Sequence, residues 1–69
     1  MGFILIKNYI KEYRKKEGLT QYELAQKIDL TRRGVIYLEN HAKDVNLSTS
    51  MKLSKVLKVS IDDLFEMDG

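Results

Sequence analysis

A chain of 69 residues is expected to form one domain, spanning residues 1–69, whose core buries about 60% of the surface exposed by the unfolded chain. The absence of cysteine excludes disulfides and thiolate chemistry, and the single His41 cannot build a multi-histidine metal site, so no metal and no cofactor are expected. The net charge is only +2, but residues 1–35 carry eight basic against four acidic side chains, whereas residues 36–69 carry four against six. The first half of the chain therefore carries an excess of positive charge, which attracts a polyanion.

A first helix is predicted over residues 6–17, where Ile6, Ile10 and Tyr13 recur at helical spacing opposite a basic face. Gly18 follows as its left-handed C-cap. The apolar residues 3–6 leave two interpretations open: they form the first turn of this helix, or a short strand or arm that joins a partner subunit. The apolar start is too short for a signal peptide or a membrane span, which indicates a cytoplasmic protein with no membrane partner.

A second and a third helix are predicted from their capping residues. Thr20 precedes a helix that starts at Gln21 and ends near Asp29, because Glu23 completes a Thr-x-x-Glu capping box. Thr31 caps a short helix over residues 32–40. Two helices joined by a turn of three or four residues form a helix-turn-helix, here over about residues 20–40. The apolar side chains expected at their crossing are Leu24, Ala25, Ile28, Leu30, Val35 and Leu38.

A loop from His41 to Val45 is expected to lead into a fourth helix, capped by Asn46 or Ser48, and Ser60 caps a last helical turn with Leu64 and Phe65. The fold class that follows is all-α, a compact bundle of five short helices. The apolar residues of the fourth helix are Leu47, Met51, Leu53, Val56 and Leu57. The residues that complete the core are expected to be Leu57, Val59, Ile61 and Leu64.

Over roughly residues 6–65 the sequence resembles the phage repressor and Cro family, the XRE-type helix-turn-helix regulators. The segments that carry the resemblance are Leu19-Thr20-Gln21, Glu23-Leu24-Ala25, Leu30-Thr31-Arg32, Leu38-Glu39-Asn40 and Val59-Ser60-Ile61-Asp62-Asp63-Leu64-Phe65. The resemblance implies a lambda-repressor-like DNA-binding domain that binds double-stranded DNA. Its C-terminal helices also supply the dimer contact, so the residues expected to complete the core can instead belong to that contact. Asp29 and His41 stand where the family usually has glycine. Aspartate tolerates the left-handed conformation, and His41 predicts a different loop path.

The resemblance places the third helix in the major groove. Arginine suits base reading because a guanidinium donates two hydrogen bonds to guanine, although two exposed arginines can also be solvated or clamp phosphates. Arg14 and Glu39 are expected to form a structural ion pair. The base-reading residues implied are Arg32, Arg33, Gly34, Ile36 and Tyr37, with Ile36 and Tyr37 exposed by helical phase and open to an alternative role in binding a protein. The phosphate-binding residues implied are Gln21, Thr31, Asn40, Lys43 and Lys16.

The expected function is a sequence-specific repressor that binds a pseudo-palindromic operator as a homodimer, with its recognition helices about 34 Å apart. No ligand domain is present, so a small-molecule effector is not expected. Catalysis is not expected either, because the sequence has no glycine-rich phosphate loop, no Ser/His/Asp set and no carboxylate pair with an evident cleft. Two alternatives stay open: the DNA-binding antitoxin of a toxin-antitoxin pair, and a protein-interaction module that has lost DNA binding.

Overall fold

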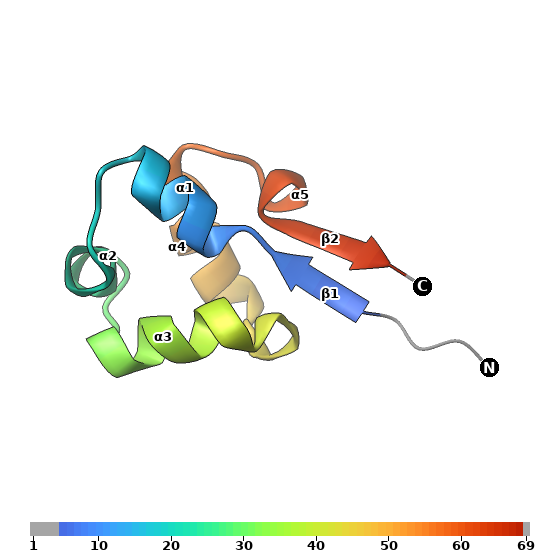
Figure 1. The fold of residues 1–69 in the computed structure, drawn as a ribbon, viewed down its shortest axis with the longest axis horizontal. Coiled ribbons are helices and arrows are strands. Elements are labelled where there is room, and N and C mark those ends of the chain that lie inside the picture. The colour runs from blue at the N-terminus through green and yellow to red at the C-terminus, as the bar shows by residue number, and fades with distance from the viewer. Residues whose placement is uncertain (1–4, 69) are drawn as a thin grey trace.

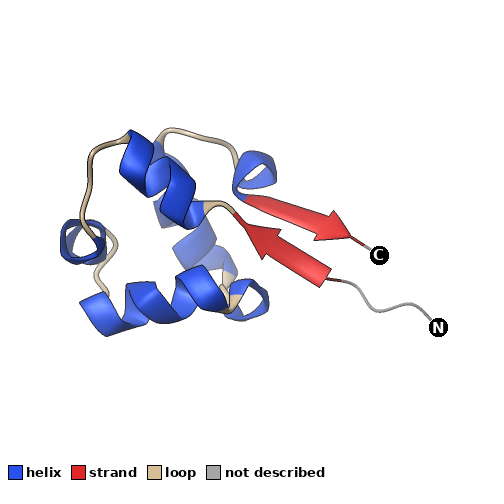
Figure 2. Cartoon of the chain, viewed as in Figure 1, coloured by secondary structure: helices blue, strands red, loops and turns tan. Residues whose placement is uncertain are grey.

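The computed structural model describes residues 5–68, which form five helices and a small sheet (Figure 1). The prediction of five helices is confirmed, and a two-stranded antiparallel sheet joins the two ends of the chain in addition (Figure 2). The helices are α1 (Ile10–Lys16), α2 (Gln21–Lys27), α3 (Arg32–Asn40), α4 (Leu47–Leu57) and α5 (Ile61–Leu64). The other elements are strands β1 (Leu5–Asn8) and β2 (Phe65–Asp68) and a 3-10 turn, η1 (Ala42–Asp44).

Polar side chains begin four of the helices, as their sequence predicts. The hydroxyl of Thr20 accepts from the backbone N–H of Glu23, and the Glu23 carboxylate accepts from the N–H of Thr20, which completes the capping box of α2. Thr31 caps α3, Asn46 caps α4 and Ser60 caps α5, each by accepting from the backbone N–H three residues later. The cap of α4 is thus Asn46 and not Ser48.

Left-handed residues follow the ends of three helices and turn the chain: Gly18 (φ 72°), Asp29 (φ 59°) and Lys58 (φ 60°). Gly18 has the predicted conformation after α1. Asp29 adopts the left-handed conformation expected at this turn, where the family that the sequence resembles has glycine, and the N–H of Leu30 then donates to the carbonyl of Ala25 at 2.8 Å. The turn between α2 and α3 is therefore built without glycine, at a cost in backbone strain.

Asp29→Gly is expected to raise the free energy of unfolding by about 1 kcal/mol, because the left-handed conformation costs other residues about 1 to 2 kcal/mol and the unfolded chain gains freedom that offsets part of it. The exposed Lys52–Asp29 pair, at 3.8 Å, contributes little. Thermal unfolding followed by circular dichroism measures the change. Gln26→Gly, inside α2, should instead destabilise by about 1 kcal/mol, and a lower melting temperature for Asp29→Gly would contradict the strain argument.

The start of the chain corrects the first predicted helix: α1 begins at Ile10, and Ile6 lies in β1, opposite Met67 of β2. Asn8 fixes this change of direction, because its side-chain carbonyl accepts from the N–H of Ile10 and its amide donates to the carbonyls of Leu38 and Glu39. The strand interpretation is therefore correct for Ile6, but the strand pairs within the same chain. Residues 3 and 4 lie outside the described residues.

Phe65 is also corrected, because it begins β2 with an extended backbone instead of closing the last helical turn. The two strands place Ile6, Asn8, Phe65 and Met67 on one face of the sheet, since paired residues share a face. The N–H of Tyr9 donates to the carbonyl of Leu64 at 2.8 Å and extends the pairing to the helices. The sheet is therefore tied to α5 by this bond and to the C-terminal end of α3 by the side chain of Asn8.

The core lies between α1, the α2–α3 pair, α4 and α5, and its buried apolar residues are Ile10, Leu24, Ala25, Ile28, Val35, Leu38, Leu53, Leu57 and Leu64. Leu30 was expected between α2 and α3 but is 38% exposed, because it follows the left-handed turn and no longer shares the inner face of α2. Ile61 was expected in the core and is exposed, and Leu47 and Met51, two of the apolar residues of the fourth helix, are exposed as well. The face of α4 that meets the core instead carries Ser50, Leu53 and Leu57.

Candidate DNA-binding surface

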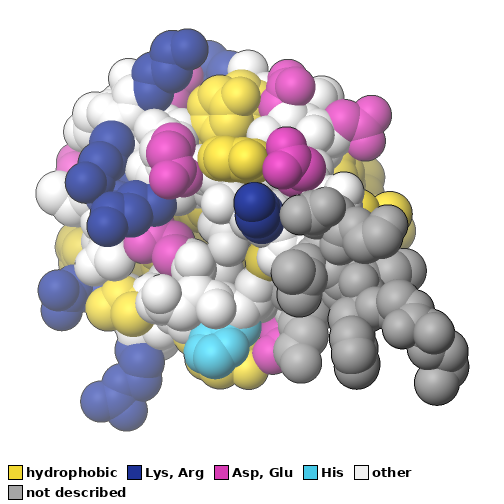
Figure 3. Space-filling model, turned by 45° about the vertical axis from the view of Figure 1, so that its right-hand side comes forward, with side chains coloured by type: hydrophobic (Ala, Val, Ile, Leu, Met, Phe, Trp, Pro, Cys, Tyr) yellow, Lys and Arg dark blue, Asp and Glu magenta, His cyan; other side chains and the backbone are white. Residues whose placement is uncertain are grey.

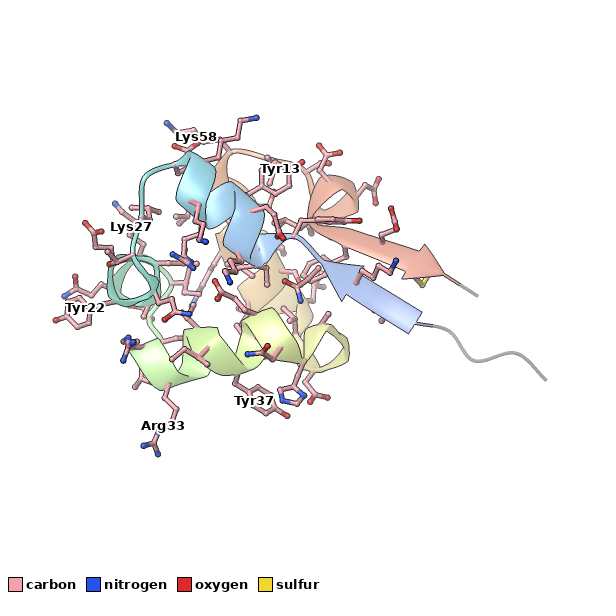
Figure 4. The ribbon with its side chains drawn as sticks, in the orientation of Figure 1. Tyr13, Tyr22, Lys27, Arg33, Tyr37 and Lys58 are labelled. Atoms are coloured by element: carbon pink, nitrogen blue, oxygen red, sulfur yellow. The ribbon has the colours of Figure 1, made fainter. Side chains whose placement is uncertain are left out.

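The third helix presents one long face to solvent. It runs along the lower edge of the molecule in Figure 1, and Val35 and Leu38 hold its inner side in the core. Arg32 and Arg33 are exposed in its first turn. Arg33 and Tyr37, four residues apart, extend from α3 away from the other helices (Figure 4), and Tyr37 is 48% exposed. This outward face is an α-helix with exposed polar side chains, the kind of element that the major groove of DNA admits.

The start of α3 combines a cap with a glycine. The Thr31 hydroxyl accepts from the N–H of Gly34 at 3.0 Å, and its own hydrogen remains to donate elsewhere. A Cβ added to Gly34 would lie 3.4 Å from the Thr31 oxygen and 3.6 Å from Cβ of Leu30, which is ordinary van der Waals contact. Packing among the described residues therefore does not require glycine at position 34.

A buried ion pair fastens α3 to α1 and α2. Arg14 Nε donates to Glu39 Oε2 at 2.8 Å, as the resemblance implied, and the Arg14 guanidinium also donates to the carbonyl of Leu19. Gln21 Nε2 donates to the second oxygen of Glu39 at 3.0 Å. One of the two amide hydrogens of Gln21 is thus engaged, and the other remains for an anion at the start of α2. The network holds α3 in a fixed orientation against α1 and α2.

The remaining predicted residues lie in less constrained places. Ile36 is half-buried, not exposed as its phase predicted. Asn40 is exposed, and one hydrogen of its side-chain amide donates to the carbonyl of Ile36 at 2.8 Å, which leaves the second amide hydrogen as a donor. Lys16 is exposed at the end of α1. The side chain of Lys43 lies outside the part of the structure that is described.

Tyr37 is held in place by two residues outside the predicted set of base-reading and phosphate-binding residues. Its hydroxyl donates to Asp44 Oδ2 at 2.5 Å, and its ring stacks on His41 with centroids 4.2 Å apart. The Asp44 carboxylate, by accepting this hydrogen bond and by its charge, raises the pKa of Tyr37 above its ordinary value. The sequence predicts a loop for residues 41–45, and helical spacing does not report these contacts because α3 ends at Asn40, before His41 and Asp44.

Basic side chains gather on the side of the molecule that carries α2 and the start of α3. Figure 3 shows dark blue Lys and Arg side chains along the left of the view, on that side, while magenta Asp and Glu side chains lie nearer its centre and upper right. The last turn of α1 adds the exposed Lys15 and Lys16. A surface with clustered Lys and Arg attracts a polyanion and accelerates its association.

The carboxylate of Glu23 gives this region one pH-dependent contact. The Thr20 backbone N–H lowers the pKa of Glu23 below its ordinary value of 4.5. The folded state binds this proton less readily than the unfolded chain, so the stabilisation is present above pH 4.5 and is lost as the pH falls through the lowered pKa. Glu23→Gln is expected to show a weaker fall of melting temperature with acid than wild type, and equal slopes for the two proteins would contradict this.

Known proteins match the chain in sequence and in fold. The HTH_3 helix-turn-helix family model matches residues 10–64. An HTH-type transcriptional regulator of Archaeoglobus fulgidus is 37% identical over 59 residues, covering 86% of this chain and 84% of the relative. One of Methanocaldococcus jannaschii is 37% identical over 60 residues, covering 87% and 91%. The N-terminal DNA-binding domain of SinR from Bacillus subtilis superposes with a TM-score of 0.67 at 32% identity, covering 75% of this chain and 77% of that domain.

The fold and the outward face of α3 thus define a helix-turn-helix DNA-binding domain. The chain belongs to the HTH_3 helix-turn-helix family of DNA-binding transcriptional regulators, as its motifs had indicated. Members of this family act by binding double-stranded DNA. Within residues 5–68, the structure contains no helix that is both long and apolar enough to cross a membrane.

Proposed function

We propose that this protein is a sequence-specific transcriptional repressor that binds a pseudo-palindromic operator as a homodimer. The observation that carries the proposal is the capped start of α3, where Arg32 and Arg33 stand exposed and Arg33 and Tyr37 share the outward face. An arginine in this position donates two hydrogen bonds to O6 and N7 of guanine. Repression follows because a bound dimer occupies promoter DNA and excludes the polymerase.

The residues of the proposed interface divide into those that read bases and those that bind phosphates. Arg32, Arg33 and Tyr37 read base edges, Gly34 lets the helix backbone approach the DNA closely, and the half-buried Ile36 contributes the edge of its side chain to a thymine methyl. The residues proposed to bind phosphates are Gln21, Thr31, Asn40, Lys43 and Lys16. In this proposal the single domain acts in the cytoplasm without catalysis, cofactor or small-molecule effector.

The sheet formed by β1 and β2 supports the homodimer. Two strands of four residues are marginal by themselves, and their apolar face is incompletely covered, with Ile6 38% and Met67 72% exposed. Ile6, Phe65 and Met67 line a hollow together with residues of η1 and α4. This hollow lies at the C-terminal end of α3, so a second copy seated on it around a two-fold axis presents both α3 helices to one side of the DNA.

The DNA-binding proposal is tested by selecting bound sites from a random pool of double-stranded DNA with the wild-type protein at several salt concentrations. The expected result is a two-fold symmetric motif whose half-sites are about 34 Å apart, one turn of the DNA helix. Weak binding with a steep salt dependence and no enriched sequence would mean that the protein contacts phosphates alone, and would overturn the repressor proposal.

The dimer proposal is tested by analytical ultracentrifugation of two matched variants. Met67→Asp places a charge on the apolar face of the sheet and is expected to convert the dimer to a monomer. Met51→Asp makes the same substitution at a methionine of α4 that is 51% exposed and lies outside the hollow, and it should leave the mass unchanged. A wild-type monomer over the whole concentration range, or the same response from both variants, would contradict the proposed interface.

A further inference from the structure

Tyr37 lies on the outward face of α3, and its hydroxyl already has a hydrogen-bond partner. Its hydroxyl donates to Asp44 Oδ2 at 2.5 Å, and Asp44 lies at the end of η1, the turn that follows α3. The stacked imidazole of His41, with an interplanar angle of 26°, covers one side of its ring. The N–H of Asp44 donates to the carbonyl of His41 at 3.1 Å, which holds the carboxylate near the ring. The ring plane and the hydroxyl are therefore both fixed.

The hydrogen bond to Asp44 determines what the Tyr37 oxygen can still do. A phenol carries one hydrogen, and an ionised carboxylate only accepts, so the hydrogen of Tyr37 is committed to Asp44. The lone pairs of the phenol oxygen remain, and an oxygen in this state accepts hydrogen bonds. In the major groove, the N6 amine of adenine and the N4 amine of cytosine are donors, whereas O6 of guanine and O4 of thymine are acceptors.

We propose that Asp44 is a specificity-determining residue: it fixes Tyr37 as a hydrogen-bond acceptor and so selects adenine or cytosine at the base that Tyr37 meets. Asp44 acts through Tyr37 and needs no contact with a base. The inference rests on the proposed function, in which α3 lies in the major groove. It adds a determinant of the operator sequence that lies beyond the recognition helix itself.

A purely structural role of Asp44 predicts a different outcome. If the carboxylate only fastened η1 to α3, its loss would lower stability and weaken binding to every sequence alike. As a specificity determinant, Asp44 also brings a negative charge toward the DNA phosphates, which repel it. Asp44→Asn is then expected to relax the base preference while affinity for DNA in general stays the same or rises. Only a specificity-determining role of Asp44 therefore predicts a loss of base discrimination without a loss of affinity.

The experiment compares bound sites selected from a random DNA pool by wild type, Asp44→Asn and Tyr37→Phe at one salt concentration. Wild type is expected to favour adenine or cytosine over guanine and thymine about three- to tenfold at one position of each half-site, the size of one net hydrogen bond. The amide of Asp44→Asn can donate to the phenol and release its hydrogen, so this preference should disappear. Tyr37→Phe should lose it too, while the other positions of the motif persist.

Two controls keep the outcome specific. Asp62→Asn removes an exposed carboxylate from α5 and should leave the whole motif unchanged. A carbon-13 titration of labelled tyrosine should show the pKa of Tyr37 falling toward its ordinary value in Asp44→Asn, in a protein whose melting temperature verifies that it is folded. Persistence of the adenine or cytosine preference in that folded variant would overturn the inference alone. A wild-type protein that enriches no motif would overturn it together with the proposed function.

Discussion

Glu39→Gln is expected to lower the free energy of unfolding by about 3 to 5 kcal/mol, because it leaves the Arg14 guanidinium buried without its counter-ion. The side chains of Arg14 and Glu39 are only 8% and 6% exposed, so water cannot replace the lost charge. Glutamine has nearly the shape of glutamate and can still accept one hydrogen bond, which assigns the loss to charge. A domain of this size has roughly 5 kcal/mol of stability, and the variant should be largely unfolded at physiological temperature.

Urea denaturation of Glu39→Gln and of Glu17→Gln measures this difference. Glu17 forms an exposed pair with Lys58 at 4.0 Å, and its neutralisation should change the stability by less than about 0.5 kcal/mol. Arg14→Met combined with Glu39→Gln removes the orphaned charge and is expected to recover part of the loss. A cost below about 1 kcal/mol for Glu39→Gln would show that the pair does not hold α1 and α3 together.

Replacing Arg32 and Arg33 together by alanine has the largest effect that we expect on DNA binding. Each bidentate contact of an arginine with guanine is worth about 1 to 3 kcal/mol of discrimination, so the double variant should lose about 2 to 6 kcal/mol of affinity for the selected operator. The two side chains lie in the first turn of α3 and outside the core, so folding should not change. Fluorescence anisotropy with the operator and with unrelated DNA of equal length measures the loss.

The matched control is Lys11→Ala combined with Lys15→Ala, which removes the same charge from exposed positions of α1. Its operator preference should be retained, whereas the arginine variant should lose most of its preference for the operator over unrelated DNA and keep only the part that Tyr37 and Ile36 supply. If both double variants lose affinity equally on all sequences, and the salt dependence falls by about one unit for each lost contact, the arginines are phosphate clamps and do not read bases.

The parts of the fold that depend on neighbouring residues were predictable. Thr20 with Glu23 forms its capping box because both groups lie three residues apart, and Asp29 takes the left-handed turn because a helix must end before the next begins. The sheet was not predictable in this way, because β1 and β2 come from opposite ends of the described chain and no local pattern reports their pairing. Ile6 therefore fitted a helical repeat equally well.

The sequence could predict the position of candidate site residues whose role does not depend on a contact with another side chain. Arg32 and Arg33 follow from the motif, and their exposure follows from the cap at Thr31. The state of Tyr37 depends on Asp44, which reaches it only after η1 has turned the chain back. Helical phase placed Ile36 on the surface, but its neighbours in the folded domain half-bury it.

The pairing of β1 with β2 also sets an order of events in folding. The helix-turn-helix contacts join segments that follow one another closely, whereas the sheet closes a loop that contains all five helices. The entropy lost on closing a loop grows with its length, and distant contacts form more slowly than local ones. The recognition helix is therefore expected to reach its place before the sheet closes. A nascent chain would then acquire the proposed DNA-reading face first and the proposed dimer surface last.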